Sequence, residues 1–225
     1  MKYTPNLTRS ERNYGLIAMA VCMLILPVIL GLTLPDFSAA RLNFISHFLN
    51  MGIIVYVLRS YLLRNLKIAL AHPFYTIYYA CLGYMAHLAM SEIVMFATYS
   101  LCPEFLNRND QNVTAQLGQE LELMIIAVAV LAPIAEECFF RGLLFRGFYD
   151  RSPRLSWALS AGLFAAVHVV NYLGTYTPLE LLLSFVQYLP AGVALGFAYR
   201  RGGSIFCPIL THMLVNIMAL WGTLA

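Results

Sequence analysis

The chain has 225 residues, of which 60% are hydrophobic and only 11% are charged, with a formal net charge of +3. Soluble domains carry about 45–50% apolar and about 25% charged residues, so this composition excludes a soluble enzyme and a disordered segment. The small net charge excludes a nucleic-acid-binding protein. Five scattered cysteines without a CxxC spacing suggest neither a disulfide framework nor a cysteine-ligated zinc site. We therefore interpret the sequence as an integral membrane protein.

Seven apolar stretches are each long enough to cross a bilayer, which requires about 20 residues of helix. They cover residues 14–34, 43–63, 74–101, 121–147, 155–173, 179–199 and 204–224. Turn-forming residues separate them, such as Pro35-Asp36, the polar run 107–112 and Gly202-Gly203. The sequence predicts an all-α, polytopic helix bundle that forms one membrane-embedded domain over residues 1–225. The first stretch is longer than the apolar run of a cleaved signal peptide, so we expect it to stay as an anchor.

Basic residues alternate strongly between the two sets of loops. One set of loops and adjoining span ends contains Lys2, Arg9, Arg12, Arg59, Arg64, Lys67, Arg146, Arg151, Arg154, Arg200 and Arg201. The other set contains only Arg41 and Arg108. Because cytoplasmic loops are enriched in Lys and Arg, we expect a cytoplasmic N-terminus and an external C-terminus.

Two adjacent carboxylates in the fourth span have different partners available to them. Glu137 and Arg141 are four residues apart on one helix face, so they can neutralise each other. Glu136 is rotated by about 100° from that face and lacks such a partner. Since an ionisable residue inside a span costs at least about 2.5–3.5 kcal/mol, an unpaired Glu136 indicates function. It is our candidate general base.

Polar groups also occur in the fifth and seventh spans. His168 has small neighbours that allow close helix approach, and His212 and Asn216 are spaced i,i+4, so that both face one side of a helix. Counted at 1.5 Å per residue from the basic ends of their spans, Glu136, His168 and His212 lie about 16, 15 and 12 Å deep. The sequence therefore predicts that three helices bring these groups to one layer, in a cavity open to the cytoplasm.

At this point the motifs resemble a known family. Glu136-Glu137-xxx-Arg141-Gly142, then Phe164-xxx-His168, then His212-xxx-Asn216 is similar to the three-motif pattern of the CPBP family. These are CAAX-protease and bacteriocin-processing intramembrane proteases, also called the Abi family and related to the Ras-converting CAAX prenyl proteases. The resemblance covers about residues 120–220, and the first three spans carry no motif of this family.

The resemblance implies catalytic roles for Glu136, His168, His212 and Asn216. Glu136 would be the general base, His168 would hold the water, and His212 and Asn216 would stabilise an oxyanion. Glu137, Arg141 and Phe164 would support these groups. The family has been described both as metalloproteases and as metal-independent glutamate proteases. Glu136, His168 and His212 could form a His₂Glu zinc site, but without an HExxH pair nothing specifies zinc, and we favour a mechanism with no cofactor.

Two other ionisable residues, His87 and Glu92 in the third span, are five residues apart and share no helix face. We expect them to hydrogen-bond inside the bundle. Gly192 and Gly196 are spaced as in closely packed helices, and we expect close packing there.

The function we favour is an intramembrane endopeptidase that cleaves a hydrophobic or membrane-associated peptide near the cytoplasmic side of a bacterial cell membrane. The alternative is a non-catalytic immunity or scaffold protein that binds a peptide partner in the bilayer. A transporter is a weaker third hypothesis, because no symmetrical pair of broken helices indicates a midplane substrate site. The short chain makes a eukaryotic enzyme with prenylated substrates the less favoured interpretation.

Overall fold

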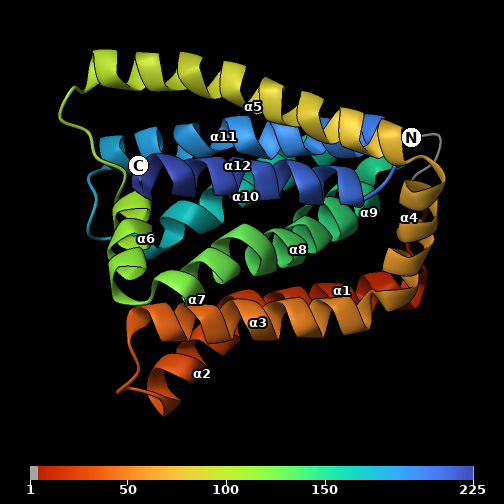
Figure 1. Cartoon of the computed structure of the whole chain (residues 1–225), viewed down its shortest axis with the longest axis horizontal. Coiled ribbons are helices and arrows are strands. Elements are labelled where there is room, and N and C mark those ends of the chain that lie inside the picture. Colours follow the sequence, from red (N-terminus) through yellow and green to blue (C-terminus); the bar gives the residue numbers. More distant parts are fainter. Residues whose placement is uncertain (1–4, 225) are drawn as a thin grey trace.

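Seven helices within residues 5–224, the part of the chain that this computed structural model describes, are long and apolar enough to cross a membrane. They confirm an all-α, multi-pass membrane protein, and no strand occurs in that range (Figure 1). The candidate spans are Arg9–Thr33, Ala39–Val57, Pro73–Leu101, Leu121–Tyr149, Pro153–Tyr172, Pro178–Gly202 and Phe206–Leu224. Lys2, which belongs to the basic set, and Ala225 lie outside the described residues.

Several spans consist of more than one helical segment. In chain order the elements are α1 (Arg9–Ala20), η1 (Val21–Ile25), α2 (Leu26–Thr33), α3 (Ala39–Val57), α4 (Arg59–Ala71), α5 (Pro73–Leu101), α6 (Arg108–Gln119), α7 (Leu121–Ile126), η2 (Ala127–Leu131), α8 (Ala132–Glu137), η3 (Cys138–Phe145), α9 (Arg146–Tyr149), α10 (Pro153–Val169), η4 (Val170–Tyr172), α11 (Pro178–Gly202) and α12 (Phe206–Leu224). The segments η1, η2 and η3 are π-helical, whereas η4 is a 3₁₀ turn.

The second span is shorter than predicted. It was expected to run to residue 63, but α3 ends at Val57, and α4 starts after Leu58, whose ψ of 14° leaves the helical region. The cause is amphipathicity, because α4 buries Tyr61, Asn65 and Ala69 on one face while its other faces carry basic residues. It lies at one end of the bundle rather than along it (Figure 1).

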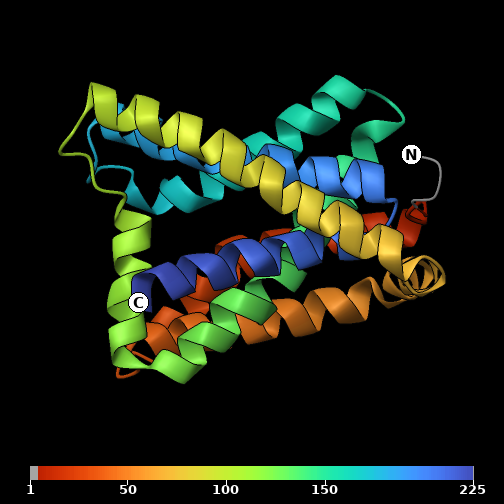
Figure 2. The same cartoon turned by 45° about the horizontal axis from the view of Figure 1, so that its top comes forward.

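Residues 107–112 separate the third and fourth spans, as predicted, but they are not a loop. Asn107 caps the short helix α6, and residues 108–112 begin it. The Asn107 side chain accepts a hydrogen bond from the amide of Asn109, which caps the helix, and Asp110 in the first turn suits the positive end of the helix dipole. Figures 1 and 2 show α6 crossing the end of the bundle opposite α4, close to the C-terminus.

Glycines allow the helices of the C-terminal half to approach closely. α11 packs against α5 and α10, and α12 packs against α5. A Cβ at Gly192 would lie 2.9 Å from the Cα of Ala161, and one at Gly196 would lie 2.7 Å from the Trp157 ring. The expected close packing at this pair is therefore confirmed, and it brings α10 and α11 together beside the fourth span.

The larger hydrophobic core lies toward the end of the bundle that carries α4. Its side chains come from the ends of α3 and α11, from the start of α4, from η3 and from the residues before α12. Fully buried members of this core are Ile54, Leu58, Tyr61, Phe139, Phe140, Phe145, Tyr199 and Ile205. A smaller cluster, formed by Ala40, Leu117, Met124, Ala129 and Leu220, lies toward α6. The space between the helices is therefore filled at one end and less completely at the other.

Candidate active site

The four residues predicted to be catalytic line one cavity. Glu136, His168, His212 and Asn216 come from α8, α10 and α12, and all four contribute to the wall of a cavity of about 860 Å³. The three residues predicted to support them, Glu137, Arg141 and Phe164, are at most 2% exposed and do not reach that wall. Residues separated by up to 80 positions in the sequence are thus divided into an inner surface and a layer directly behind it.

Glu137 is the centre of the buried layer. Its Oε1 accepts one hydrogen bond from Arg141 Nη1 at 3.0 Å and a second from His212 Nδ1 at 2.8 Å. Arg141 also donates through Nη2 to the carbonyl oxygen of Gly192 at 3.0 Å, and its guanidinium lies over the Phe164 ring. Glu137 and Arg141 are both 0% exposed, so the two charges compensate each other inside the protein. One carboxylate oxygen therefore positions both the arginine and a cavity-lining histidine.

The hydrogen bond from each histidine's Nδ1 fixes what its other nitrogen can do. His168 Nδ1 lies 2.7 Å from the carbonyl oxygen of Phe164, which can only accept, so Nδ1 carries the proton. In the neutral ring His168 Nε2 is then an acceptor. The same holds for His212, whose Nδ1 donates to Glu137. His212 can donate from Nε2 only as the imidazolium, a condition that the expected oxyanion role did not include.

Asn216 is held by an irregularity of the fourth span. In the π-helical segment η2 the amide of Ala132 donates to Ala127 and leaves the carbonyl of Val128 free. The next residue that could donate to it is Pro133, which has no N–H. The Asn216 side chain supplies the missing donor, with Nδ2 at 2.7 Å from that carbonyl oxygen. One N–H of Asn216 is used in this way, and the second remains available to the cavity.

Glu136 has a different environment from its neighbour. It is partly exposed to the cavity, and its Oε2 is buried without a hydrogen-bond partner among the described residues. An unpartnered carboxylate oxygen facing a cavity is free to accept a proton from a bound water. The division that the sequence suggested, with one paired and one unpaired carboxylate, is present in the structure.

A polar stripe on α3 was not predicted from the sequence. On α3, which packs against the fourth span, Asn43, Ser46, His47 and Asn50 line the cavity. The charges of Glu136 and His168 act on His47. The i, i+3, i+4, i+7 spacing of these four residues is the signal that would have found them. His47 lies in the second span and is not among the residues that the sequence analysis predicts for the site.

The cavity opens at the end of the bundle that carries α6. Asn109, Asp110 and Asn112 of α6 line it there, as does Thr223 near the end of α12. We expected the cavity to open to the cytoplasm, but the larger hydrophobic core fills the end with most Lys and Arg, which the sequence analysis places on that side. The surrounding protein raises the pKa of the Asp110 carboxyl above its usual range, although the Tyr188 hydroxyl opposes this by donating to it at 2.8 Å.

The two ionisable residues of the third span do not hydrogen-bond as expected across the bundle. Glu92 is exposed on the outer surface of α5, among Met95, Phe96 and Tyr99. His87 is half-buried, and its Nδ1 lies 3.2 Å from the hydroxyl of Ser91 on the same helix. Neither residue lines the large cavity. The expectation of a bundle-internal bond is therefore wrong for Glu92.

The donor types for zinc are present, but their arrangement does not fit an ion. His168 and His212 each leave Nε2 free, and Glu136 offers a carboxylate, which are the ligand types of a His₂Glu site. Within residues 5–224, however, no three His, Cys, Asp or Glu side chains lie close enough together to hold a metal ion.

Comparisons with known proteins agree with the resemblance read from the motifs. The model of the "Type II CAAX prenyl endopeptidase Rce1-like" family matches residues 118–218, the part of the chain that contains all three motifs. "Putative membrane peptidase YdiL" of Bacillus subtilis is 29% identical over 114 residues, which are 49% of this chain and 42% of that protein. An "Uncharacterized 24.3 kDa protein" of Escherichia coli is 26% identical over 98 residues, or 44% of this chain and 43% of that protein.

The chain therefore matches less than half the length of each of these relatives. No solved structure matches the chain. The comparisons agree with a multi-pass membrane protein similar to membrane peptidases, and the bacterial relatives make a bacterial origin plausible.

Proposed function

We propose that this protein is an intramembrane endopeptidase that hydrolyses a peptide bond by means of a water activated by Glu136. The observation that carries the proposal is that all four candidate catalytic residues line one cavity while their partners lie buried behind it. A protein that only binds a peptide has no need of an unpaired carboxylate, whose burial is costly. The substrate would be a peptide or protein in or next to the bilayer.

The chemistry follows from the free atoms of the site. Glu136 accepts a proton from water while the water oxygen attacks the carbonyl carbon of the scissile bond, and His168 Nε2 accepts the second hydrogen of that water. The negative charge then develops on the carbonyl oxygen. The remaining N–H of Asn216 and the imidazolium of His212 donate to this oxygen. Glu136 returns its proton to the leaving nitrogen, the C–N bond breaks, and a carboxyl and an amino terminus are released.

The decisive variant is Glu136→Gln, because an amide keeps the shape of the carboxylate but cannot accept the proton from water. We expect normal amounts of protein in the membrane and no cleavage. Glu122→Gln is the matched control, since Glu122 is an exposed acid in α7 of the same span. Membrane proteomes of cells that produce wild-type protein and Glu136→Ala would show the uncleaved substrates. A fully functional Glu136→Gln variant would favour the immunity or scaffold hypothesis instead.

Asn216→Ala separates oxyanion stabilisation from water activation. Removal of one oxyanion donor typically lowers the rate by about 10²–10³-fold, so weak turnover should remain. Glu136→Ala should leave none that can be measured. Equal, complete inactivation by both substitutions, with both proteins folded, would contradict the role given to Asn216.

Zinc dependence is the alternative within the protease class, with Glu136, His168 and His212 as ligands. In the mechanism proposed above, the purified protein keeps its activity after treatment with a strong chelator. Metal analysis provides a readout that does not need activity. One zinc per chain, lost in both His168→Ala and His212→Ala, together with activity restored by added zinc, would replace the metal-free mechanism.

A further inference from the structure

The two ends of the bundle differ in how far they close the active-site cavity. At the end that carries α4, the space between the helices is filled by the larger hydrophobic core. The hydroxyls of Tyr61 and Tyr199, both fully buried, are 2.7 Å apart there. The Asn65 side chain accepts from the amide of Ile205 and donates to the carbonyl of Tyr61. These contacts join α4 to the segment before α12.

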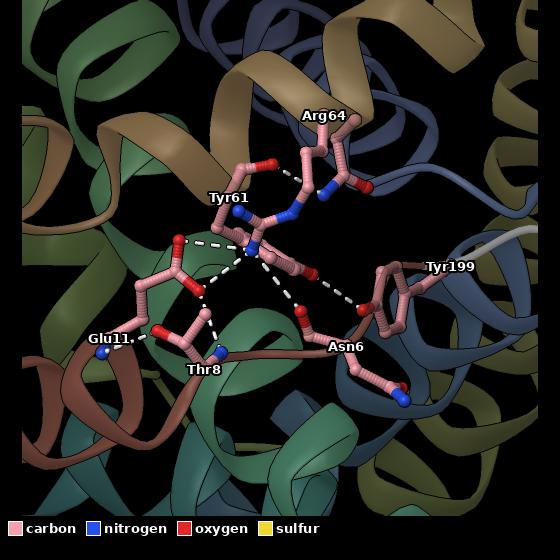
Figure 3. A network of polar contacts seen from close by, with 7 residues as sticks. Asn6, Thr8, Glu11, Tyr61, Arg64 and Tyr199 are labelled. Atoms are coloured by element: carbon pink, nitrogen blue, oxygen red, sulfur yellow. Dashed lines mark hydrogen bonds and ion pairs between the residues drawn. The ribbon is translucent and has the colours of Figure 1, made fainter.

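A second set of contacts closes the same end further out. Arg64 of α4 donates to the carboxylate of Glu11 in α1 at 2.7 Å and to the carbonyl of Asn6 at 3.2 Å (Figure 3). Thr8 and Glu11 form a capping box that fixes the start of α1. Figure 3 shows Tyr61 and Tyr199 beside this network, so that α1, α4 and α11 meet at the closed end.

The distribution of basic residues assigns the closed end to the cytoplasm. Among the described residues, those at the closed end are Arg9, Arg12, Arg59, Arg64, Lys67, Arg146, Arg151, Arg154, Arg200 and Arg201. Only Arg41 and Arg108 lie at the open end. Since Lys and Arg are retained on the cytoplasmic side, this asymmetry directs the open end of the cavity to the outside of the cell.

Beside α6 the cavity wall carries many polar side chains among apolar ones, and none of the described lining residues there is positively charged. Amides line it from two helices, Asn43 and Asn50 on α3 and Asn109, Asn112 and Gln116 on α6. Asp110 adds a carboxylate, and none of the described lining residues is Lys or Arg. The Oδ1 of Asn50 is buried without a hydrogen-bond partner among the described residues. Amide side chains both donate and accept, so they suit the backbone of an extended polypeptide better than a lipid chain.

We infer that the site takes its substrate from the non-cytoplasmic face of the membrane, as an extended and non-acidic polypeptide segment that enters beside α6. This inference rests on the proposed protease function and specifies its substrate class. It replaces the cytoplasmic access expected from the sequence, and it disfavours a lipid-anchored tail on the cytoplasmic side.

Cysteine labelling tests the direction of access without any need for activity. In a background without the five native cysteines, Thr114→Cys and Thr223→Cys place a thiol in the cavity mouth, and Lys67→Cys places one on exposed α4 at the closed end. We expect a membrane-impermeant maleimide to label the first two fully in intact spheroplasts. Lys67→Cys should react only after the membrane is permeabilised. Labelling of Lys67→Cys from outside, alone or with the others, would overturn the inference.

The native chain provides a second measurement if the cysteine-free protein fails to accumulate. Cys102, half-exposed at the open end of α5, should react with the same reagent in intact spheroplasts, and Cys102→Ser identifies its label. Absence of that label until permeabilisation would equally overturn the inference. Cleavage by the purified wild-type protein is measured separately. External labelling without any cleavage would therefore refute the protease and leave the direction of access established.

Discussion

Glu137→Gln should destabilise the protein far more than Glu136→Gln, although the two residues are neighbours. The glutamine keeps an oxygen that can accept from Arg141 and His212, but it removes the negative charge that compensates Arg141. Both partners are 0% exposed, so no water replaces that charge. Breaking a buried ion pair by removing one partner costs about 3–5 kcal/mol. For a chain of this length each kcal/mol lowers the unfolding midpoint by about 2–4 °C, which predicts a fall of roughly 6–20 °C.

The assay is thermal unfolding of purified protein in a mild detergent, followed by loss of the monodisperse peak on size-exclusion chromatography. Glu122→Gln, which neutralises an exposed acid of the same span, controls for the change in net charge. Glu136→Gln should unfold close to the wild-type temperature, since the Glu136 carboxylate forms no ion pair with any residue in the range 5–224. If Glu137→Gln is as stable as Glu122→Gln and Glu136→Gln is not, the roles of the two carboxylates are reversed.

Three further substitutions test the packing, the closed end and the cavity mouth. Gly192→Ala should lower the free energy of unfolding by about 1–3 kcal/mol, because the new Cβ would meet the backbone of Ala161. Gly162→Ala, whose Cβ would have no atom within 4 Å, should be neutral or stabilising, and equal unfolding midpoints of the two variants would refute the close contact. Tyr61→Phe should lower the free energy of unfolding by about 1–3 kcal/mol, because it leaves the buried Tyr199 hydroxyl without its partner. The double variant with Tyr199→Phe should recover part of that stability, and a double-mutant cycle of unfolding midpoints measures the difference. A peptide with lysine should be cleaved faster than its glutamate counterpart. Asp110→Asn should reduce that ratio by roughly 25-fold, because it removes about 1 kcal/mol of attraction to lysine and about 1 kcal/mol of repulsion from glutamate; an unchanged ratio would remove Asp110 from substrate selection.

Short-range spacing explains what the sequence could predict of this site. The pairing of Glu137 with Arg141 follows from four-residue periodicity along one helix, and bilayer thickness determines which stretches are spans. That Glu136, His168 and His212 meet at one cavity could also be predicted, because helical rise converts residue counts into distances along the three helices. The polar stripe on α3 followed the same rule and could have been found.

Features that depend on contacts between distant segments could not be predicted. The carbonyl of Val128 is free because of a π-helical turn, and nothing local indicates that Asn216, 88 positions later, would bond to it. The open end of the cavity depends on which end the aromatic side chains of η3, α4 and α11 fill. The sequence did not indicate that α6 is a helix, because its residues are polar and several of them line the cavity instead of contacting lipid.

The contacts of α12 also determine when during synthesis the site becomes complete. This helix follows the other six spans in the chain, and it brings both His212, the second partner of Glu137, and Asn216, the only described side-chain donor to the free carbonyl of Val128. A nascent chain that has inserted its first six spans therefore still lacks half of the cavity's candidate catalytic groups. A ribosome that stalls before α12 would leave an inert membrane intermediate, with an incompletely satisfied fourth span that quality-control proteases could recognise. The proposed catalytic site is thus complete only once α12 has docked.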